Sequence, residues 1–230
     1  MNRQLYEYSY VMRKETQRKI LTGLFYCILI FSITNLVLRF LAFPVRQVSD
    51  SMNPDFTENS MVIVTPLDKT PSRGDVMLLK PRSQSGAGFW KKTGDLFVRF
   101  FTAQQISIIN RDYTSSPQLR RVVGMPGDSI FMKNFVLYIK PAGENHFLSE
   151  FELSKKPYNV TFYTPPAGWD NSIGVKGNFD EIILGEDEYF VLGDNRKGTS
   201  DSRLWGTVSK SSFQGRILLC YFPFTCFKLY

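Results

Sequence analysis

Two serines lie two residues apart in the segment Val48–Pro54, which reads VSDSMNP. Because alternate residues of an extended backbone share one face, Ser49 and Ser51 can point at the same substrate atom. One hydroxyl can then attack a carbonyl carbon while the other donates a hydrogen bond to the oxyanion that forms, as acyl transfer requires. A bare Ser-x-Ser is also common in solvated turns and helix caps, so the pair alone does not define an active site.

Three further blocks follow the serine pair along the chain. They are Arg73–Val76 (RGDV), Arg120–Asp128 (RRVVGMPGD), and Gly193–Arg196 (GDNR) followed by Ser200–Gly206 (SDSRLWG). In this order, behind an apolar N-terminal segment, the blocks resemble type I signal peptidases (the bacterial leader peptidase family). These are membrane-bound Ser–Lys serine peptidases that remove signal peptides from exported proteins. The resemblance covers most of the chain beyond the apolar segment.

The resemblance implies a mostly β, signal-peptidase-like (LexA-type) catalytic domain behind one N-terminal transmembrane helix, with a second, smaller β-containing insertion. Its catalytic groove is expected to face the membrane. The extended end of a signal peptide is expected to bind there as an added strand, with shallow pockets for small side chains one and three residues before the cut. No cofactor and no metal are implied.

The same resemblance assigns roles to five residues of this sequence. Ser51 matches the nucleophile, and the Ser49 hydroxyl with the Ser51 backbone N–H matches the oxyanion hole. Thr199 falls where the family usually has a serine that orients the general base. Asp201 and Arg203 match a supporting ion pair behind the site.

Two residues depart from the family pattern, and one of them affects the chemistry directly. The family's general base is a lysine immediately before the Arg-x-Val-Gly sequence, and here that position is Arg120. A buried lysine can lose its charge near neutral pH and accept the serine proton. A guanidinium has a pKa above ~12 and stays protonated, so it is not expected to serve as that base. Arg121 cannot replace it, because adjacent strand residues point to opposite faces. Asp50 is the milder departure, since the family favours glycine between the two serines.

Three explanations of Arg120 follow from the sequence. The chain can be a catalytically weak or inactive paralogue that still binds signal peptides. Another lysine, such as Lys80, Lys133 or Lys197, can reach Ser51 from a different strand or loop. Alternatively, Arg120 can lower the pKa of Ser51 electrostatically and support slow turnover.

The segment Ile20–Leu38 contains no charged residue over its 19 positions. As a helix it spans roughly 28 Å, close to the thickness of the hydrocarbon core of a bilayer. A cleavable signal peptide is the alternative, but its apolar region is shorter and ends at a small-x-small site, which the following RFLAFPV lacks. The sequence therefore predicts an uncleaved transmembrane anchor over residues 20–43.

Residues 1–19 carry five basic and two acidic residues, a net charge of +3. By the positive-inside tendency this tail stays in the cytoplasm, and residues 44–230 form an extracytoplasmic peptidase domain. The predicted location is the bacterial inner (plasma) membrane, with a single pass. The expected partners are the lipid bilayer and the signal peptides of exported preproteins, with an active paralogous peptidase as a further candidate if Arg120 prevents cleavage.

The chain has 230 residues, of which 43% are hydrophobic and 21% charged, with a net charge of +7. This composition excludes a disordered tail, a collagen-like rod and a miniature disulfide scaffold. The net charge alone suggests nucleic acid as a partner. Much of it belongs to the N-terminal tail, however, and the remaining basic residues are scattered between the predicted strands, so no nucleic acid partner is expected.

Beyond the anchor, short runs rich in Val, Ile, Phe and Tyr alternate with Gly, Pro and Asp, which is typical of strands. Two segments, about 82–116 and 141–178, interrupt the pattern and are interpreted as insertions. The first has aromatic and basic residues at near-helical spacing over 90–101, which favours a helix in the core or on the membrane surface. The predicted strands lie in 61–64, 76–79, 120–124, 129–140, 181–184, 188–193 and 215–222.

The remaining reactive residue types add little chemistry. Cys220 and Cys226 can form a bridge across a turn in an oxidising compartment or remain as two buried thiols, and Cys27 lies inside the apolar segment. His146 is the only histidine and stands in a polar loop without companion ligands. A histidine-based triad and a conventional zinc site are therefore not expected.

Overall fold

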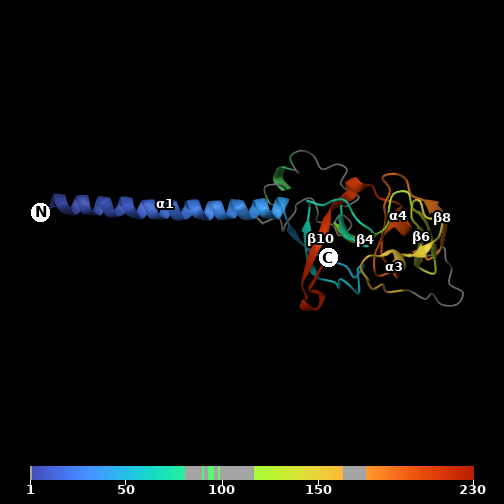
Figure 1. The fold of residues 1–230 in the computed structure, drawn as a ribbon. Coiled ribbons are helices and arrows are strands. Elements are labelled where there is room, and N and C mark those ends of the chain that lie inside the picture. The colour runs from blue at the N-terminus through green and yellow to red at the C-terminus, as the bar shows by residue number, and fades with distance from the viewer. Residues whose placement is uncertain (1, 81–89, 91–92, 96–97, 99–116, 163–174) are drawn as a thin grey trace.

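The computed structural model describes residues 2–80, 90, 93–95, 98, 117–162 and 175–230. In this part of the chain, one long helix leads into a domain built from two antiparallel sheets (Figure 1). The prediction of a mostly β domain behind one N-terminal apolar helix is confirmed. Most of the predicted insertion 82–116 lies outside the described residues. Of its predicted helix over 90–101, residues 90, 93–95 and 98 are described, and they are helical.

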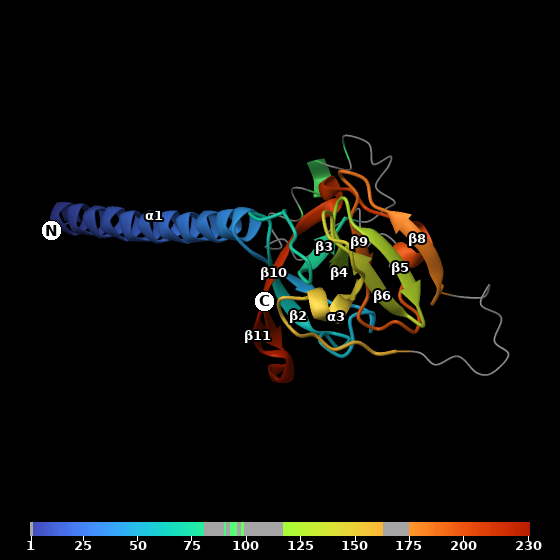
Figure 2. The same cartoon turned by 45° about the vertical axis from the view of Figure 1, so that its right-hand side comes forward.

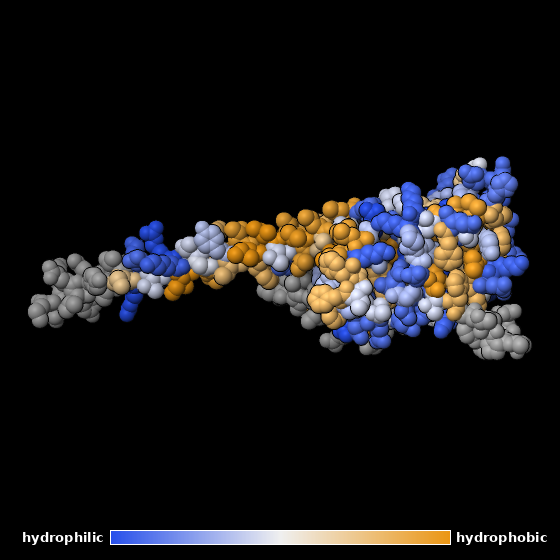
Figure 3. All heavy atoms as spheres, turned by 60° about the horizontal axis from the view of Figure 1, so that its bottom comes forward, coloured by the Kyte–Doolittle hydropathy of each residue, from blue (hydrophilic) through white to orange (hydrophobic). Residues whose placement is uncertain are grey.

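Helix α1 (Asn2–Phe40) is continuous and projects from the domain as a rod (Figure 1). It begins before the predicted span Ile20–Leu38, because the preceding residues also support a helix, as in the i,i+4 ion pair of Glu15 and Lys19 at 3.1 Å. Its part from Met12 to Phe40 is long and apolar enough to cross a membrane and is only 6% buried. Figure 3 shows this exposed apolar band, which fits a lipid environment better than water.

The first sheet has seven strands in the order β1-β2-β10-β3-β4-β9, with β11 paired to β10 (Figure 2). All of these pairs are antiparallel. This sheet holds the segments that carry the family blocks. Its strands are β1 (Phe43–Arg46), β2 (Met61–Thr65), β3 (Val76–Leu79), β4 (Gln118–Gly124), β9 (Phe190–Leu192), β10 (Phe213–Phe222) and β11 (Lys228–Leu229).

The second sheet has four strands in the order β7-β6-β5-β8 and lies at the end of the domain away from α1 (Figures 1 and 2). Its central hairpin turns at Asn134 and Phe135, whose φ angles of 51° and 65° are typical of a type I′ turn. The strands are β5 (Ser129–Lys133), β6 (Val136–Lys140), β7 (Leu148–Ser149) and β8 (Phe179–Ile183). Short helices are α3 (Glu150–Leu153), α4 (Ser202–Trp205) and the 3-10 turns η2 (Lys210–Ser212) and η3 (Phe224–Cys226).

The hydrophobic core fixes the turn that carries the serine pair. Met52 and Phe56, which follow the serine pair in the chain, are fully buried against Val62, Leu78 and other side chains of the first sheet. A second cluster joins the two sheets through their facing strands. Its members include Val123, Ile130, Leu137 and Leu192.

Each predicted run contains a strand, because its β-branched and aromatic residues are numerous enough to show a pattern. The run predicted over 129–140 is a hairpin of β5 and β6 that turns at Asn134 and Phe135. The short strands β1, β7 and β11 and the one-turn helices were not predicted. Of the predicted insertion 141–178, the described part contains β7 and α3, and residues 163–174 lie outside the described residues.

The structure joins Cys220 and Cys226 in a disulfide, which settles the alternative left open by the sequence. Cys27 is a free thiol on the exposed surface of α1. Among the described residues, no group of three potential metal ligands comes together.

We expect Leu78→Ala to lower the free energy of unfolding by about 2–5 kcal/mol, because Leu78 is fully buried and its removal leaves a cavity in the first sheet's core. The matched control is Leu67→Ala at a side chain that is 73% exposed, where a change within about 0.5 kcal/mol is expected. Chemical unfolding of the full chain in detergent measures both values. Equal losses for the two variants would contradict the assigned core.

Candidate active site

The Ser51 backbone is held from the loop after β9. Its carbonyl accepts a hydrogen bond from the Asn195 backbone N–H at 3.0 Å, and the Thr199 hydroxyl lies 3.2 Å away. Gly193 makes this approach possible, because a Cβ there would lie 2.2 Å from the Thr199 methyl carbon and 2.7 Å from the Ser51 carbonyl oxygen. The serine turn and the GDNR block are therefore packed against each other, backbone to backbone.

Three groups donate hydrogen bonds to the Ser51 Oγ. The Ser49 hydroxyl and an Arg120 guanidinium nitrogen each lie 3.0 Å away, and the Gln47 side-chain nitrogen lies 3.1 Å away. The Ser51 side chain is buried apart from a small exposed fraction of 6%. The structure thus brings Ser49, Ser51 and Arg120 together as the sequence suggested. It adds Gln47, which belongs to none of the family blocks.

Arg120 lies on β4 and is nearly fully buried. Its Nε and NH2 groups donate to the Ser200 carbonyl at 3.0 and 2.7 Å, and NH2 also donates to Gln118 at 2.8 Å. Burial lowers the pKa of Arg120 to about 10, and the nearby Asp201 carboxylate only partly opposes this effect. The guanidinium is therefore anchored at one end and directed at Ser51 with the other.

The three candidate lysines have other surroundings. Lys80 is exposed and donates to the Ser211 carbonyl at 2.6 Å, Lys133 is exposed at the end of β5 in the second sheet, and Lys197 is exposed in the loop after β9. In the part of the chain that the structure describes, the hydrogen-bond partners of the Ser51 Oγ include no lysine. The cation that contacts the Ser51 Oγ is therefore the Arg120 guanidinium and not a lysine ammonium.

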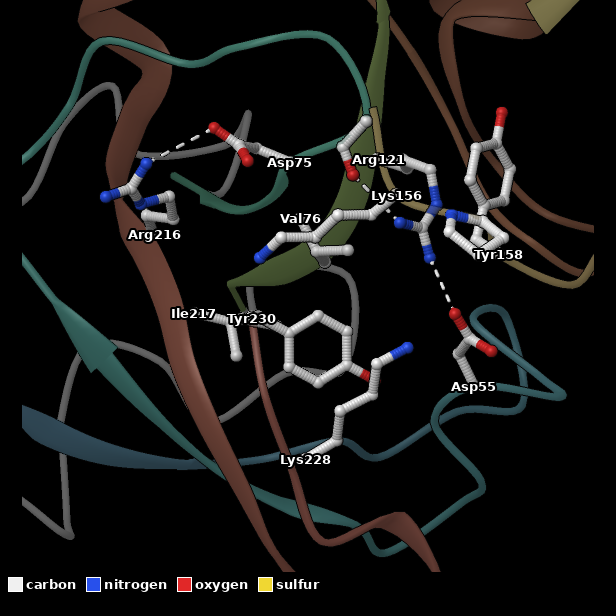
Figure 4. A pocket seen from close by; sticks show the side chains of 12 residues that line it. Asp55, Asp75, Val76, Arg121, Lys156, Tyr158, Arg216, Ile217, Lys228 and Tyr230 are labelled. Carbon is white, nitrogen blue, oxygen red and sulfur yellow. Dashed lines mark hydrogen bonds and ion pairs between the residues drawn. The ribbon is translucent and has the colours of Figure 1, made fainter. Parts of the chain in front are cut away.

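Arg121 follows Arg120 on β4, so its side chain is directed to the opposite face of the strand. Figure 4 shows its guanidinium beside Tyr158 and directed at Asp55. Arg121 forms a two-bonded ion pair with Asp194, with a second carboxylate contact to Asp55 at 3.0 Å, and its guanidinium stacks on Tyr158 at 4.1 Å. Burial alone lowers the pKa of Arg121, but the Asp194 carboxylate outweighs it and raises this pKa above its ordinary value. Arg121 thereby ties the serine turn, through Asp55, to the GDNR block.

Asp201 and Arg203 form the predicted ion pair with two hydrogen bonds of 2.7 and 2.8 Å, and both are buried. Asp201 also caps α4 and accepts from the Gly193 N–H at 3.1 Å. The Arg203 guanidinium donates to the Arg196 carbonyl at 3.1 Å. The pair therefore shapes the loop that supports Ser51, although neither residue contacts the serine hydroxyl itself.

Thr199 and Asp50 have backbone-holding contacts. The Thr199 hydroxyl is directed at the carbonyl oxygens of Ser51 and Asn195. Asp50 is exposed, and its carboxylate accepts from the Asn195 side chain at 3.2 Å. The acidic side chain between the two serines is thus exposed to solvent and hydrogen-bonded to Asn195.

A buried polar cluster connects the second sheet to this loop. Glu150 is 1% exposed and pairs with Arg196 at 2.6 Å, accepts from the Tyr158 hydroxyl at 2.7 Å and contacts the Leu137 N–H at 3.3 Å. Burial alone lowers the pKa of Arg196, but Glu150 raises it above its ordinary value. The Arg196 Nε and NH1 have no hydrogen-bond partner among the described residues, so Glu150 carries most of the compensation for this charge.

The arrangement of these residues is that of a buried serine hydroxyl that is surrounded by hydrogen-bond donors and supported by buried ion pairs. The family model described as signal peptidase, peptidase S26, matches residues 19–222. The chain therefore belongs to the signal peptidase family, peptidase S26.

Individual relatives agree with this assignment. The chain is 32% identical over 137 residues to a signal peptidase I P of Bacillus subtilis subsp. natto, covering 59% of this chain and 64% of that protein. It is 29% identical over 119 residues to a signal peptidase IB of Staphylococcus aureus, covering 52% and 58% of the two chains. The match thus spans less than two thirds of the length of these relatives.

A solved structure shows a further likeness. A signal peptidase I from Enterococcus faecalis V583 matches with a TM-score of 0.32 and 21% identity, covering 64% of this chain and 96% of that one.

We expect Glu150→Ala to destabilise the domain by about 3–5 kcal/mol, because it leaves the fully buried Arg196 charge without its carboxylate. The control is Glu181→Ala, which removes a partly exposed ion pair with Lys140 at 3.4 Å and should cost less than about 1 kcal/mol. Thermal and chemical unfolding of both full-length variants measure the difference. A Glu150 variant as stable as the Glu181 variant would show that the Glu150–Arg196 ion pair does not make the expected contribution to stability.

Proposed function

We propose that this chain is a membrane-anchored serine endopeptidase that removes N-terminal signal peptides from exported proteins by acyl-enzyme chemistry at Ser51. The observation that carries the proposal is the set of donors at the Ser51 Oγ in a chain of the signal peptidase family. The proposed roles follow the residue types. Ser51 attacks the scissile carbonyl, and the Ser49 hydroxyl with the Ser51 N–H binds the oxyanion.

Arg120 is proposed to take the place of the general-base lysine in this mechanism. With its pKa lowered to about 10, roughly one Arg120 in a thousand is neutral at pH 7. A neutral guanidine accepts the Ser51 proton as Oγ attacks the carbonyl carbon, and the guanidinium returns this proton to the leaving amine. A serine alkoxide beside a charged guanidinium has the same number of protons and gives the same pH dependence. Activity is therefore expected to rise with pH.

The proposed topology places residues 1–19 in the cytoplasm, residues 20–43 in the bacterial inner membrane and residues 44–230 outside. The exposed apolar part of α1 and the basic residues before it support this orientation. The disulfide of Cys220 and Cys226 also favours an oxidising, extracytoplasmic compartment. The lipid bilayer and signal peptides are the proposed partners, and the peptide is expected to bind as an added strand.

A second candidate function is a non-cleaving paralogue that binds signal peptides and works with an active peptidase. The observation that favours it is the guanidinium at the Ser51 Oγ, which is mostly charged at neutral pH and a poor proton acceptor. The two candidates share the groove and the partner peptide. They differ in whether the peptide bond is cut.

We expect the purified full-length protein in detergent to cleave a preprotein with an Ala-x-Ala site, and Ser51→Ala to reduce this cleavage by at least about 10⁴-fold, because the nucleophile is lost. The Ser60→Ala variant controls for loss of a nearby hydroxyl that does not contact Ser51 in the described hydrogen bonds. Gel analysis and mass spectrometry of the products measure the cut. No cleavage by the wild type, with retained peptide binding, would favour the non-cleaving paralogue.

The pH dependence separates the two candidates further. For the enzyme, log(kcat/KM) should rise by about one per pH unit up to a plateau near the Arg120 pKa of about 10. Arg120→Lys should move this plateau to lower pH, because the ordinary pKa of lysine lies about two units below that of arginine. Lys210→Arg controls for an exposed exchange of the two cations. Activity that appears only in Arg120→Lys supports the paralogue, and an identical profile for both proteins contradicts the proposed role of Arg120.

A further inference from the structure

Gln47 is held in place by its own backbone before its side chain is considered. It follows β1 directly, and its N–H donates to the Ser60 carbonyl while its carbonyl accepts from the Asn59 N–H, both at 2.8 Å. Its side chain is 5% exposed. The residue is therefore fixed at the base of the serine turn, four positions before Ser51.

The side-chain amide has one orientation that its neighbours permit. Its nitrogen lies 2.9 Å from the Ser49 backbone carbonyl, and a carbonyl oxygen can only accept, so the NH2 end of the amide must face it. One N–H is used in this bond. The other is directed at the Ser51 Oγ at 3.1 Å, with the Ser49 Oγ at 3.4 Å beside it.

The number of donors at the Ser51 Oγ exceeds what a neutral hydroxyl accepts well. A serine hydroxyl has two lone pairs and one proton of its own to donate. Here Gln47, Ser49 and Arg120 all donate to it, and among the described residues its own proton has no hydrogen-bond acceptor. Three donors match the three lone pairs of an alkoxide, and bonds to a charged oxygen are stronger than those to a neutral one.

We propose that Gln47 is a further catalytic residue whose side-chain amide stabilises the alkoxide form of Ser51. This inference rests on the proposed function, since it assigns a residue to the same nucleophile. Arg120 supplies the positive charge and Gln47 a neutral donor whose strength does not change with pH. The proton that leaves the Ser51 Oγ passes to Arg120 in its neutral form, as in the proposed mechanism, and Gln47 gains or loses none.

The test compares Gln47→Met with the wild type in the full-length protein. Methionine keeps the length of the side chain and removes the donor. We expect acylation of Ser51 to slow by about 10- to 100-fold at fixed pH, with KM nearly unchanged, because a bond to a charged oxygen is lost. The midpoint of the rise of rate with pH should stay in place, because Arg120 sets it, while the rate constant of acylation falls at every pH. A purely structural role would lower the burst amplitude, which counts active Ser51, and leave the rate constant of the remaining active protein unchanged.

Two variants complete the design. Gln47→Glu keeps the shape and places a carboxylate beside the developing alkoxide, so it should slow acylation more than Gln47→Met does. Gln214→Ala, on β10 and outside the site, is the matched control and should react like the wild type. Thermal unfolding verifies that each variant is folded. An unchanged acylation rate constant in Gln47→Met, or acylation as fast as the wild type in Gln47→Glu, would overturn the donor role.

The readouts separate this inference from the proposed function. Acylation is followed with a p-nitrophenyl ester, which reports on Ser51 without a signal peptide, and cleavage is followed with a preprotein. If the ester acylates wild-type Ser51 and Gln47→Met slows it, the inference stands even where no preprotein is cut. If the preprotein is cut equally by both proteins, the function stands and the inference fails. If the wild type shows neither reaction, both are overturned.

Discussion

The contact of the Arg120 guanidinium with the Ser51 Oγ is the interaction around which the site is arranged. A charge in a nearly dry pocket must be compensated by hydrogen bonds or ion pairs. The Arg120 guanidinium donates hydrogen bonds to the Ser200 carbonyl, to the Gln118 side-chain oxygen and to the Ser51 Oγ. The remaining cost lowers its pKa to about 10. The buried Arg120 thus holds the loop after β9 through the Ser200 carbonyl. It also places a positive charge beside the Ser51 Oγ, where the proposed mechanism develops negative charge.

The pocket depends on a frame of paired charges around it. Neighbouring Arg121 faces the other side of β4 and is neutralised by Asp194 and Asp55, while Asp201 and Arg203 neutralise each other below the loop. Because these charges are paired and hydrogen-bonded, they fix the positions of the backbone groups around Ser51. Removing one partner of such a pair leaves the other charge buried and unpaired, which strongly destabilises the fold.

The sequence predicted the parts of the site that lie in long family blocks. The order of the family blocks predicted that Ser49, Ser51 and Arg120 belong to one site. Runs of Val, Ile and Phe predicted the strands that bring these residues into contact. Gln47 could not be found this way, because a single glutamine forms no sequence pattern. The direction of its side chain depends on the backbone hydrogen bonds that Gln47 makes with Asn59 and Ser60. Glu150 was missed for a related reason, since it belongs to an insertion and becomes buried only when the second sheet packs on Arg196.

The surroundings of position 120 fit arginine by shape as well as by charge. The Nε and Nη2 groups of Arg120 both donate to the Ser200 carbonyl, while Nη1 donates to the Leu119 carbonyl and to the Ser51 Oγ. A lysine carries its donors on one nitrogen and cannot hold a carbonyl and a serine oxygen at separate ends of a planar fork. Lysine at this position would gain a more accessible neutral form and lose the bond that ties β4 to the loop after β9. In this chain, proton affinity and loop support are therefore linked through one side chain.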